Sequence, residues 1–77
     1  MEIAVCLGSR LDQQQVKDVK WPYNCLLVGI RRVETEIIPH GNTIILSGDY
    51  LSILAHEEQA PKTNKALQLL AETISKP

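Results

Sequence analysis

The chain has 77 residues and a formal net charge of −1, which limits it to one small domain without the basic stripe of a nucleic-acid-binding protein. Hydrophobic residues make up 44% of the chain, as in folded proteins, whereas aromatic residues make up 4% and Phe is absent. A core of Ile, Leu and Val in so short a chain is marginal unless a partner, a metal or a disulfide adds to it. We therefore expect a protein partner and no nucleic acid.

The cysteines and apolar runs exclude several classes of protein. Cys6 and Cys25 lie within or beside apolar runs and are expected to be buried free thiols. Two Cys and two His without close spacing do not form a zinc pattern, so no metal is expected. The longest apolar run, CLLVGI, has six residues, far fewer than the ~20 that span a bilayer. A strand pattern that begins almost at the first residue indicates that residues 1–77 are a single domain excised from a longer protein.

The N-terminal segment is expected to form a strand and a short helix. EIAVCL, residues 2–7, alternates in a period of two with β-branched residues on one face, which is typical of a strand. Asp12 and Gln15 have the spacing of a capping box, which predicts a helix over 13–19. That helix must end before Pro22, because the residue preceding a proline avoids helical geometry.

Two apolar segments then lie close enough in sequence to form an antiparallel hairpin. CLLVGIRR, residues 25–32, is apolar on both alternating faces up to its basic end, as in a covered strand. Gly29 within it indicates a bulge or a close backbone approach. EII, residues 36–38, is a short strand that Pro39 stops.

Further strands and a helix follow. TIIL, residues 43–46, is a short apolar segment, and YLSILAH, residues 50–56, alternates as a strand does. Pro61 suits the first turn of a C-terminal helix. An apolar stripe at helical spacing supports this helix: Leu67, Leu70, Ala71 and Ile74. The predicted order of elements is β-α-β-β-β-α, with 43–46 as an additional short apolar segment.

The polar residues of the central turns resemble an active site in type but not in arrangement. His40, Ser47 and Asp49 lie within ten residues, on two tight turns, whereas catalytic triads usually draw on separate elements. Gly41 and Gly48 are instead expected to make these turns, and Asn42 and Asp49 to cap backbone N–H groups. The sequence predicts no catalytic residue; a small enzyme using His40 and Asp49 is the disfavoured alternative.

The stretch CLLVGIRRVETEIIPHGNTIILSGDYLSIL resembles the TrkA-C domain, the C-terminal domain of regulators of potassium conductance. The shared features are a strand with a basic end, an apolar pair before Pro39, Gly-Asn-Thr at 41–43, and Gly-Asp-x-Leu at 48–51, which is the most specific. The resemblance implies an α+β fold, mostly antiparallel sheet or pseudo-barrel, with a C-terminal helix. KWPYNCLLVGIRR and IIPHGNTIILSGDYL look most like the version at the C-terminus of bacterial ClC-type chloride channels or transporters.

The resemblance also implies a function and partners. Domains similar to this one lie at the cytoplasmic face of the membrane, as parts of potassium uptake regulators, cation antiporters, anion permeases and ClC-type proteins. It implies a regulatory, homodimeric domain whose other partner is the transmembrane ion-transport domain of the same parent chain. A chloride channel-like parent is favoured, and potassium or other cation transport is possible. Some relatives bind a small ligand in the dimer cleft, cyclic di-AMP among them; a dimerisation module without ligand is the alternative.

A small anionic ligand such as a cyclic dinucleotide needs cationic donors and flat apolar walls together. One part of the chain offers both, and it supplies the candidate ligand-binding residues: Arg31, Arg32, Ile37, Ile38, Pro39 and His40. The two arginines are expected on opposite faces of their strand. Cyclic di-AMP binders tend to have His-Ile-Pro where this chain has Ile-Ile-Pro. Ile37 and Ile38 are expected to contribute to the dimer interface.

Overall fold

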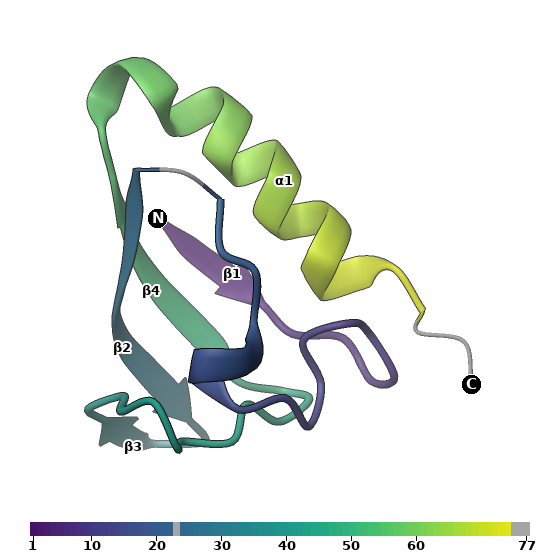
Figure 1. Ribbon diagram of the computed structural model, residues 1–77. Coiled ribbons are helices and arrows are strands. Elements are labelled where there is room, and N and C mark those ends of the chain that lie inside the picture. The colour runs from purple at the N-terminus through teal and green to yellow at the C-terminus, as the bar shows by residue number, and fades with distance from the viewer. Residues whose placement is uncertain (23, 75–77) are drawn as a thin grey trace.

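The computed structural model describes residues 1–22 and 24–74, which form an antiparallel four-stranded sheet with one α-helix packed on one side (Figure 1). The strands are β1 (Glu2–Ala4), β2 (Cys25–Arg32), β3 (Thr35–Ile37) and β4 (Tyr50–Ala55). The helices are the 3₁₀ turns η1 (Val16–Asp18) and η2 (Glu57–Gln59) and the α-helix α1 (Ala60–Glu72). The α+β class and the antiparallel sheet with a C-terminal helix are confirmed.

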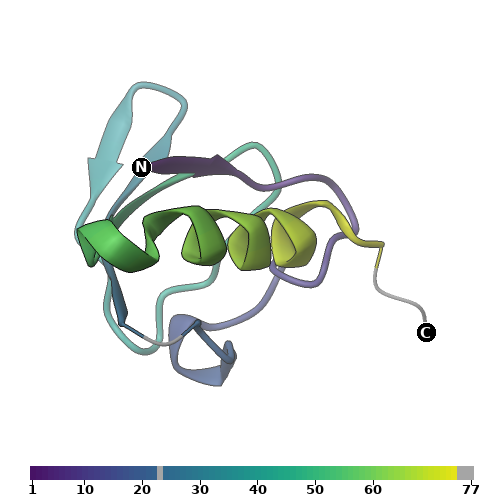
Figure 2. The same cartoon turned by 90° about the horizontal axis from the view of Figure 1, so that it is seen from above.

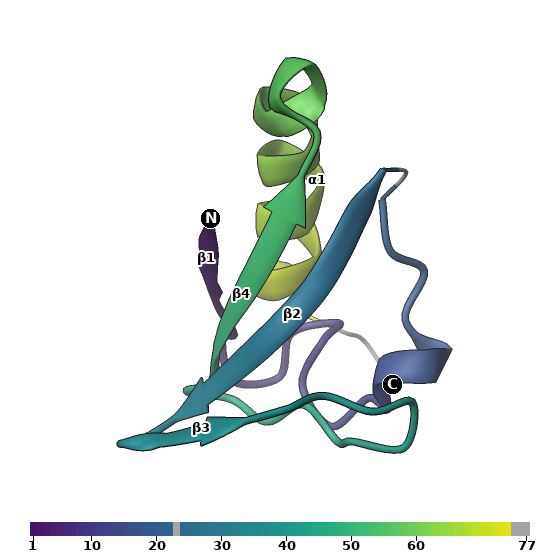
Figure 3. The same cartoon turned by 90° about the vertical axis from the view of Figure 1, so that its left-hand side faces the viewer.

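The strands lie in the order β1-β4-β2-β3, so the longest strands occupy the centre (Figure 3). The predicted hairpin is confirmed, with Arg31 of β2 opposite Glu36 of β3. The register between β2 and β4 shifts between Leu27 and Gly29, which is the bulge that the glycine predicts. A Cβ at Gly29 would lie 3.8 Å from Cβ of Ser52 on β4, an ordinary contact, so the bulge and not a close backbone approach distinguishes this position.

Helix α1 covers one face of the sheet and runs alongside β1 (Figure 2). Pro61 lies in its first turn, where the missing N–H costs nothing, and Leu67 and Ala71 are fully buried. Ile74 was expected to extend the same apolar stripe, but the helix ends at Glu72 and Ile74 is 62% exposed. The core beneath the helix is aliphatic: Ile3, Val5, Leu11, Ile30, Ile45, Leu51, Ile53, Leu67 and Ala71.

The helix predicted over 13–19 is wrong; only the 3₁₀ turn η1 forms there. Gln13 has a φ of +67°, and backbone groups between Gln13 and Lys17 form four hydrogen bonds with the segment 41–45. Asp12, expected to cap the helix, accepts instead from the N–H groups of Gly8 at 2.8 Å and Ser47 at 3.0 Å. Long-range backbone pairing therefore satisfies the groups that a helix would have used.

The apolar segment 43–46 pairs with this connection and is not a regular strand. Ile44 forms an isolated antiparallel bridge with Gln15, and Ile45 is fully buried. The apolar segment thus contributes to the core without extending the sheet.

The two cysteines differ from the expectation that they are buried. Cys6 is exposed and Cys25 is only half-buried, although both are free thiols.

Candidate ligand-binding site at the hairpin

The candidate site lies where β2 ends, where β3 follows, and in the turn after β3. Alternation along β2 places Arg31 and Arg32 on opposite faces of the sheet. Arg31 lies on the face away from α1, where its Nη2 is 3.3 Å from Oε1 of Glu2. Its guanidinium carbon also lies 4.8 Å from the ring centre of Tyr50, within cation–π range. The side chain keeps 44% of its surface exposed, so the ion pair is screened by water.

Arg32 faces the core side, and its guanidinium donates two hydrogen bonds to the carboxylate of Asp49. Nε lies 2.9 Å from Oδ1 of Asp49, and Nη2 lies 2.8 Å from Oδ2 and 2.8 Å from the carbonyl oxygen of Ile44. This bidentate geometry is the strongest form of arginine–carboxylate pairing. Arg32 therefore ties the end of β2 to the two turns that precede β4.

Asp49 is buried, with 1% of its surface exposed, and it forms the turn between 46 and 49. Its Oδ2 accepts the N–H of Leu46 at 2.9 Å, and Gly48 within the turn has a φ of +87°. Burial alone would raise the pKa of Asp49, but the hydrogen bonds from Arg32 and Leu46 and the charge of Arg32 hold that pKa below its ordinary value. The same hydrogen bond raises the pKa of Arg32, so the pair is fully charged at neutral pH.

The residues after Arg32 divide between core and surface. Ile37 pairs with Ile30 and packs against the core, whereas Ile38 is 78% exposed. Pro39 is half-buried and His40 is exposed. The candidate site is therefore split: Arg31 and Ile38 are accessible, whereas Arg32 and Ile37 already have partners within the domain.

The turn after Pro39 is capped by Thr43 and not, as the sequence predicted, by Asn42. The hydroxyl of Thr43 accepts the N–H of His40 at 2.9 Å, and the Thr43 N–H donates to the carbonyl of His40 at 3.1 Å. Gly41 and Asn42 form the middle of this turn, without positive φ, and the Gly41 carbonyl accepts the N–H of Lys17. A threonine after Gly-Asn is itself a turn signal, and it identifies the capping group.

Two more contacts of the site come from distant segments. Glu2 belongs to β1 and Tyr50 to β4, and both reach Arg31 across the sheet. Nothing in the local sequence marks them, because their proximity follows from strand order. The Asp49 carboxylate is occupied by Arg32, so it does not orient His40 as a catalytic base would require. Among residues 1–22 and 24–74, no group of three His, Cys, Asp or Glu side chains could hold a metal ion.

Comparison with known proteins agrees with this architecture. The family model of the TrkA-C domain matches residues 1–68. The chain belongs to the TrkA-C domain family. Eleven chains of solved structures match it, among them one described as "Structure of RCK domain with cda". That structure has a TM-score of 0.73 and 26% sequence identity, and the match covers 91% of this chain and 94% of the other. No curated protein matches the sequence.

Membership in the TrkA-C family makes the chain a regulatory domain of the kind used in ion transport, and not an enzyme. RCK domains typically dimerise and associate with transport proteins. None of the helices in the described part of the chain is long and apolar enough to cross a membrane.

Proposed function

We propose that residues 1–77 form one regulatory domain of a longer ion-transport protein and lie at the cytoplasmic face of the membrane. The proposed partners are a second copy of the domain and the transmembrane part of the same parent chain. A chloride channel or transporter of the ClC type is the favoured parent, with potassium or other cation transport as the alternative. The domain would transmit ligand occupancy to the ion pathway through its dimer.

The surface opposite α1 supports dimerisation. In the view of Figure 3 the strands β2 and β4 lie in front of α1, so this face of the sheet is turned away from the helix. Leu26, Val28 and Leu54 project from it with 60%, 50% and 63% of their surfaces exposed. Ile38 follows β3 on the neighbouring edge and is 78% exposed. Contiguous exposed apolar surface of this kind marks an interaction site, and a two-fold axis would cover it on both copies.

The observation that supports a ligand is the pairing of an accessible cation with accessible apolar surface at this edge. Arg31 keeps 44% of its side chain exposed and is held only by the exposed Glu2 and the ring of Tyr50. A phosphate group binds a guanidinium more strongly than a single exposed carboxylate does, because it offers several acceptor oxygens. Ile38, Pro39 and the exposed His40 would supply the walls for a base.

The proposed ligand is a cyclic dinucleotide such as cyclic di-AMP. A two-fold symmetric molecule with two phosphates fits a dimer that presents Arg31 twice. The similar RCK domain is described as solved "with cda". Arg32 is assigned a supporting role, because its donors are engaged by Asp49 and Ile44. It would hold the end of β2 in place and leave Arg31 as the main phosphate contact.

Light scattering tests the dimer. The wild-type chain is expected to have the mass of two copies at micromolar concentration, and Ile38→Ser is expected to shift it toward monomer. Leu7→Ser is the matched control, because Leu7 is 76% exposed but lies outside the sheet and the hairpin. A monomeric wild type would contradict the dimer, and equal weakening by the two variants would place the interface elsewhere.

Calorimetry tests the contact with the ligand. Arg31→Gln is expected to weaken cyclic di-AMP binding by about tenfold or more, the loss of one charge-assisted contact per chain. Glu2→Gln is expected to strengthen it, because the competing carboxylate is removed. Lys62→Gln, which removes a charge from exposed helix surface, is the control. Unchanged affinity of Arg31→Gln would mean that the phosphates bind elsewhere.

A further inference from the structure

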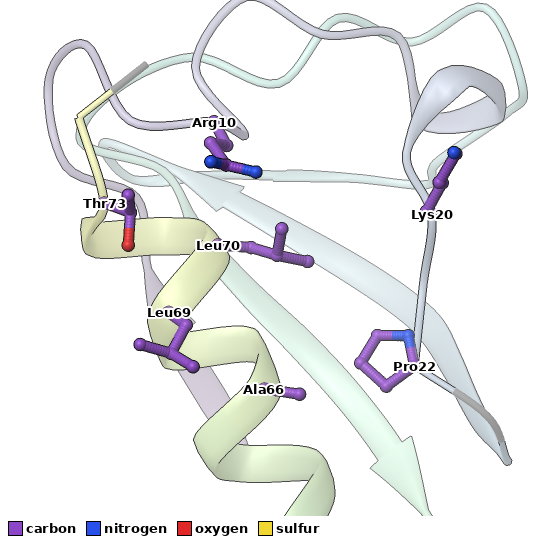
Figure 4. Close-up of a pocket in the computed structure, with 7 residues that line it drawn as sticks. All are labelled: Arg10, Lys20, Pro22, Ala66, Leu69, Leu70 and Thr73. Carbon is purple, nitrogen blue, oxygen red and sulfur yellow. The ribbon is translucent and has the colours of Figure 1, made fainter. Parts of the chain in front are cut away.

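A concave site separate from the hairpin lies between α1 and the segment before β2. It has a volume of about 470 Å³, which is within the range of small-molecule sites. Figure 4 shows Leu70 projecting from α1 toward the segment that carries Lys20 and Pro22. None of the hairpin residues Arg31 to His40 lines this cavity.

The lining combines apolar surface with two cations. Ala66, Leu69 and Leu70 provide a wall from α1, and Leu69 is 60% exposed although it is apolar. Arg10 and Lys20 lie on opposite sides of the cavity in Figure 4 and come from different parts of the chain. Within the described residues, the salt bridges are Arg31–Glu2 and Arg32–Asp49, so no described carboxylate forms a salt bridge with Arg10 or Lys20. The cavity therefore has a cation on each of two sides and an apolar wall from α1.

The walls are fixed by hydrogen bonds, so the cavity is preformed. The N–H of Arg10 donates to the carbonyl of Thr73 at 3.1 Å, which holds that loop against the end of α1. Trp21 Nε1 donates to the carbonyl of Val16 at 3.0 Å, and Cys25 Sγ donates to the carbonyl of Pro22 at 3.2 Å. Burial raises the pKa of the Cys25 thiol, so it stays protonated as a donor at neutral pH. A preformed site loses less free energy on binding than a mobile one.

We propose that this cavity binds a small organic anion with one negatively charged group and an apolar body. Arg10 and Lys20 would attract the charged group from the two sides of the cavity, and the apolar body would lie along the wall that Leu69 and Leu70 line. The occupant would bridge α1 and the connection between β1 and β2. It would thus stabilise their relative position without contacting the hairpin.

Nuclear magnetic resonance titration of the 77-residue chain with 4-phenylbutyrate tests this proposal, because that molecule has one carboxylate and one apolar ring. The backbone signals of Arg10, Lys20, Ala66, Leu69 and Leu70 are expected to shift, with a Kd of about 1 mM, typical of a small ligand with few contacts. The neutral 4-phenylbutanamide is expected to bind at least about fivefold more weakly. Acetate, which lacks the apolar body, is expected to leave these signals in place.

Variants separate charge from simple apolar contact. Arg10→Gln and Lys20→Gln are each expected to weaken 4-phenylbutyrate binding by about three- to tenfold. Lys62→Gln is the control, since Lys62 is exposed on α1 but does not line the cavity. Equal binding of acid and amide, no shift at these residues at about 10 mM, or the same shifts on dilution of the protein alone would overturn the proposal. The last result would mean that a second copy covers the cavity.

Discussion

Arg32 and Asp49, which are 17 residues apart in sequence, form a bidentate ion pair with N–O distances of 2.9 and 2.8 Å. The carboxylate is 1% exposed, whereas the arginine side chain keeps 33% of its surface accessible. Arg32 also donates to the carbonyl of Ile44, and Asp49 also accepts the N–H of Leu46. The pair therefore fixes the turns before β4 relative to the end of β2.

Arg32→Gln is expected to lower the free energy of unfolding by about 2–3 kcal/mol, because it leaves a buried carboxylate without its cation. The adjacent Arg31→Gln is the matched control and should cost less than about 1 kcal/mol, since its pair with Glu2 is exposed. Urea unfolding at pH 7 measures the free-energy change of each variant from its transition midpoint, provided that the dependence of the free energy on urea concentration is unchanged. Equal midpoints for the two variants would contradict the structural role of Arg32.

The acid stability of the domain is expected to depend on Asp49. Its pKa is lowered in the folded state, so the unfolded chain binds the proton more readily, and this contribution to stability is present above the unfolded pKa of about 4. It is lost as the pH falls through the lowered folded pKa. Thermal melts below about pH 4 should therefore fall less steeply for Asp49→Asn than for wild type. Parallel curves would show that Asp49 contributes nothing to the acid transition.

A β-carbon at Gly48 is expected to lower the free energy of unfolding, because the φ of this residue is +87°. A Cβ there would meet no atom within 4 Å, so the cost of Gly48→Ala comes from the backbone alone and should be about 1–2 kcal/mol. Gly41→Ala is the control: its φ is not positive, and its new Cβ would lie 3.5 Å from Cβ of Lys17, an ordinary contact. Chemical denaturation that ranks the two variants equally would contradict this assignment.

The turn between β2 and β3 is expected to be improved by a substitution. Val33 has a φ of +57°, which is unfavourable for a β-branched residue, and it is 88% exposed, so little burial compensates. Val33→Asn should raise the free energy of unfolding by about 0.5–1 kcal/mol, since Asn accepts this conformation more readily. Glu34→Asn, at the next position, where φ is not positive, should change it little. Destabilisation by Val33→Asn would mean that Val33 has a packing partner in the dimer.

The sequence predicted those features that depend on local pattern. The alternation in 50–56, the bulge at Gly29 and the stripe with Leu67 and Ala71 each follow from side-chain periodicity or a single residue type. The helix over 13–19 failed because backbone groups of this segment pair with 41–45 and Asp12 bonds to Gly8 and Ser47, which local sequence does not reveal. Side-chain periodicity by itself indicates only which residues of a strand lie on the same face.

Contacts of the candidate site were predictable only in part. That Arg31 and Arg32 face opposite ways follows from strand alternation. Which carboxylate each one meets depends on strand order and register, and Glu2 and Asp49 lie 29 and 17 residues away along the chain. The family resemblance indicated the segment of the candidate site. The different partners of Arg31 and Arg32 became known only from the structure.

We propose above that a dimer of this domain binds one two-fold symmetric anionic ligand through the Arg31 edge. Calorimetric titration of the wild-type dimer with cyclic di-AMP tests it most directly, because the stoichiometry reports the symmetry. We predict saturation at one ligand per two chains, with the heat abolished or much reduced in Arg31→Gln. No heat at about 100 μM ligand with the dimer verified in the same sample, or saturation at one ligand per chain, would contradict the claim.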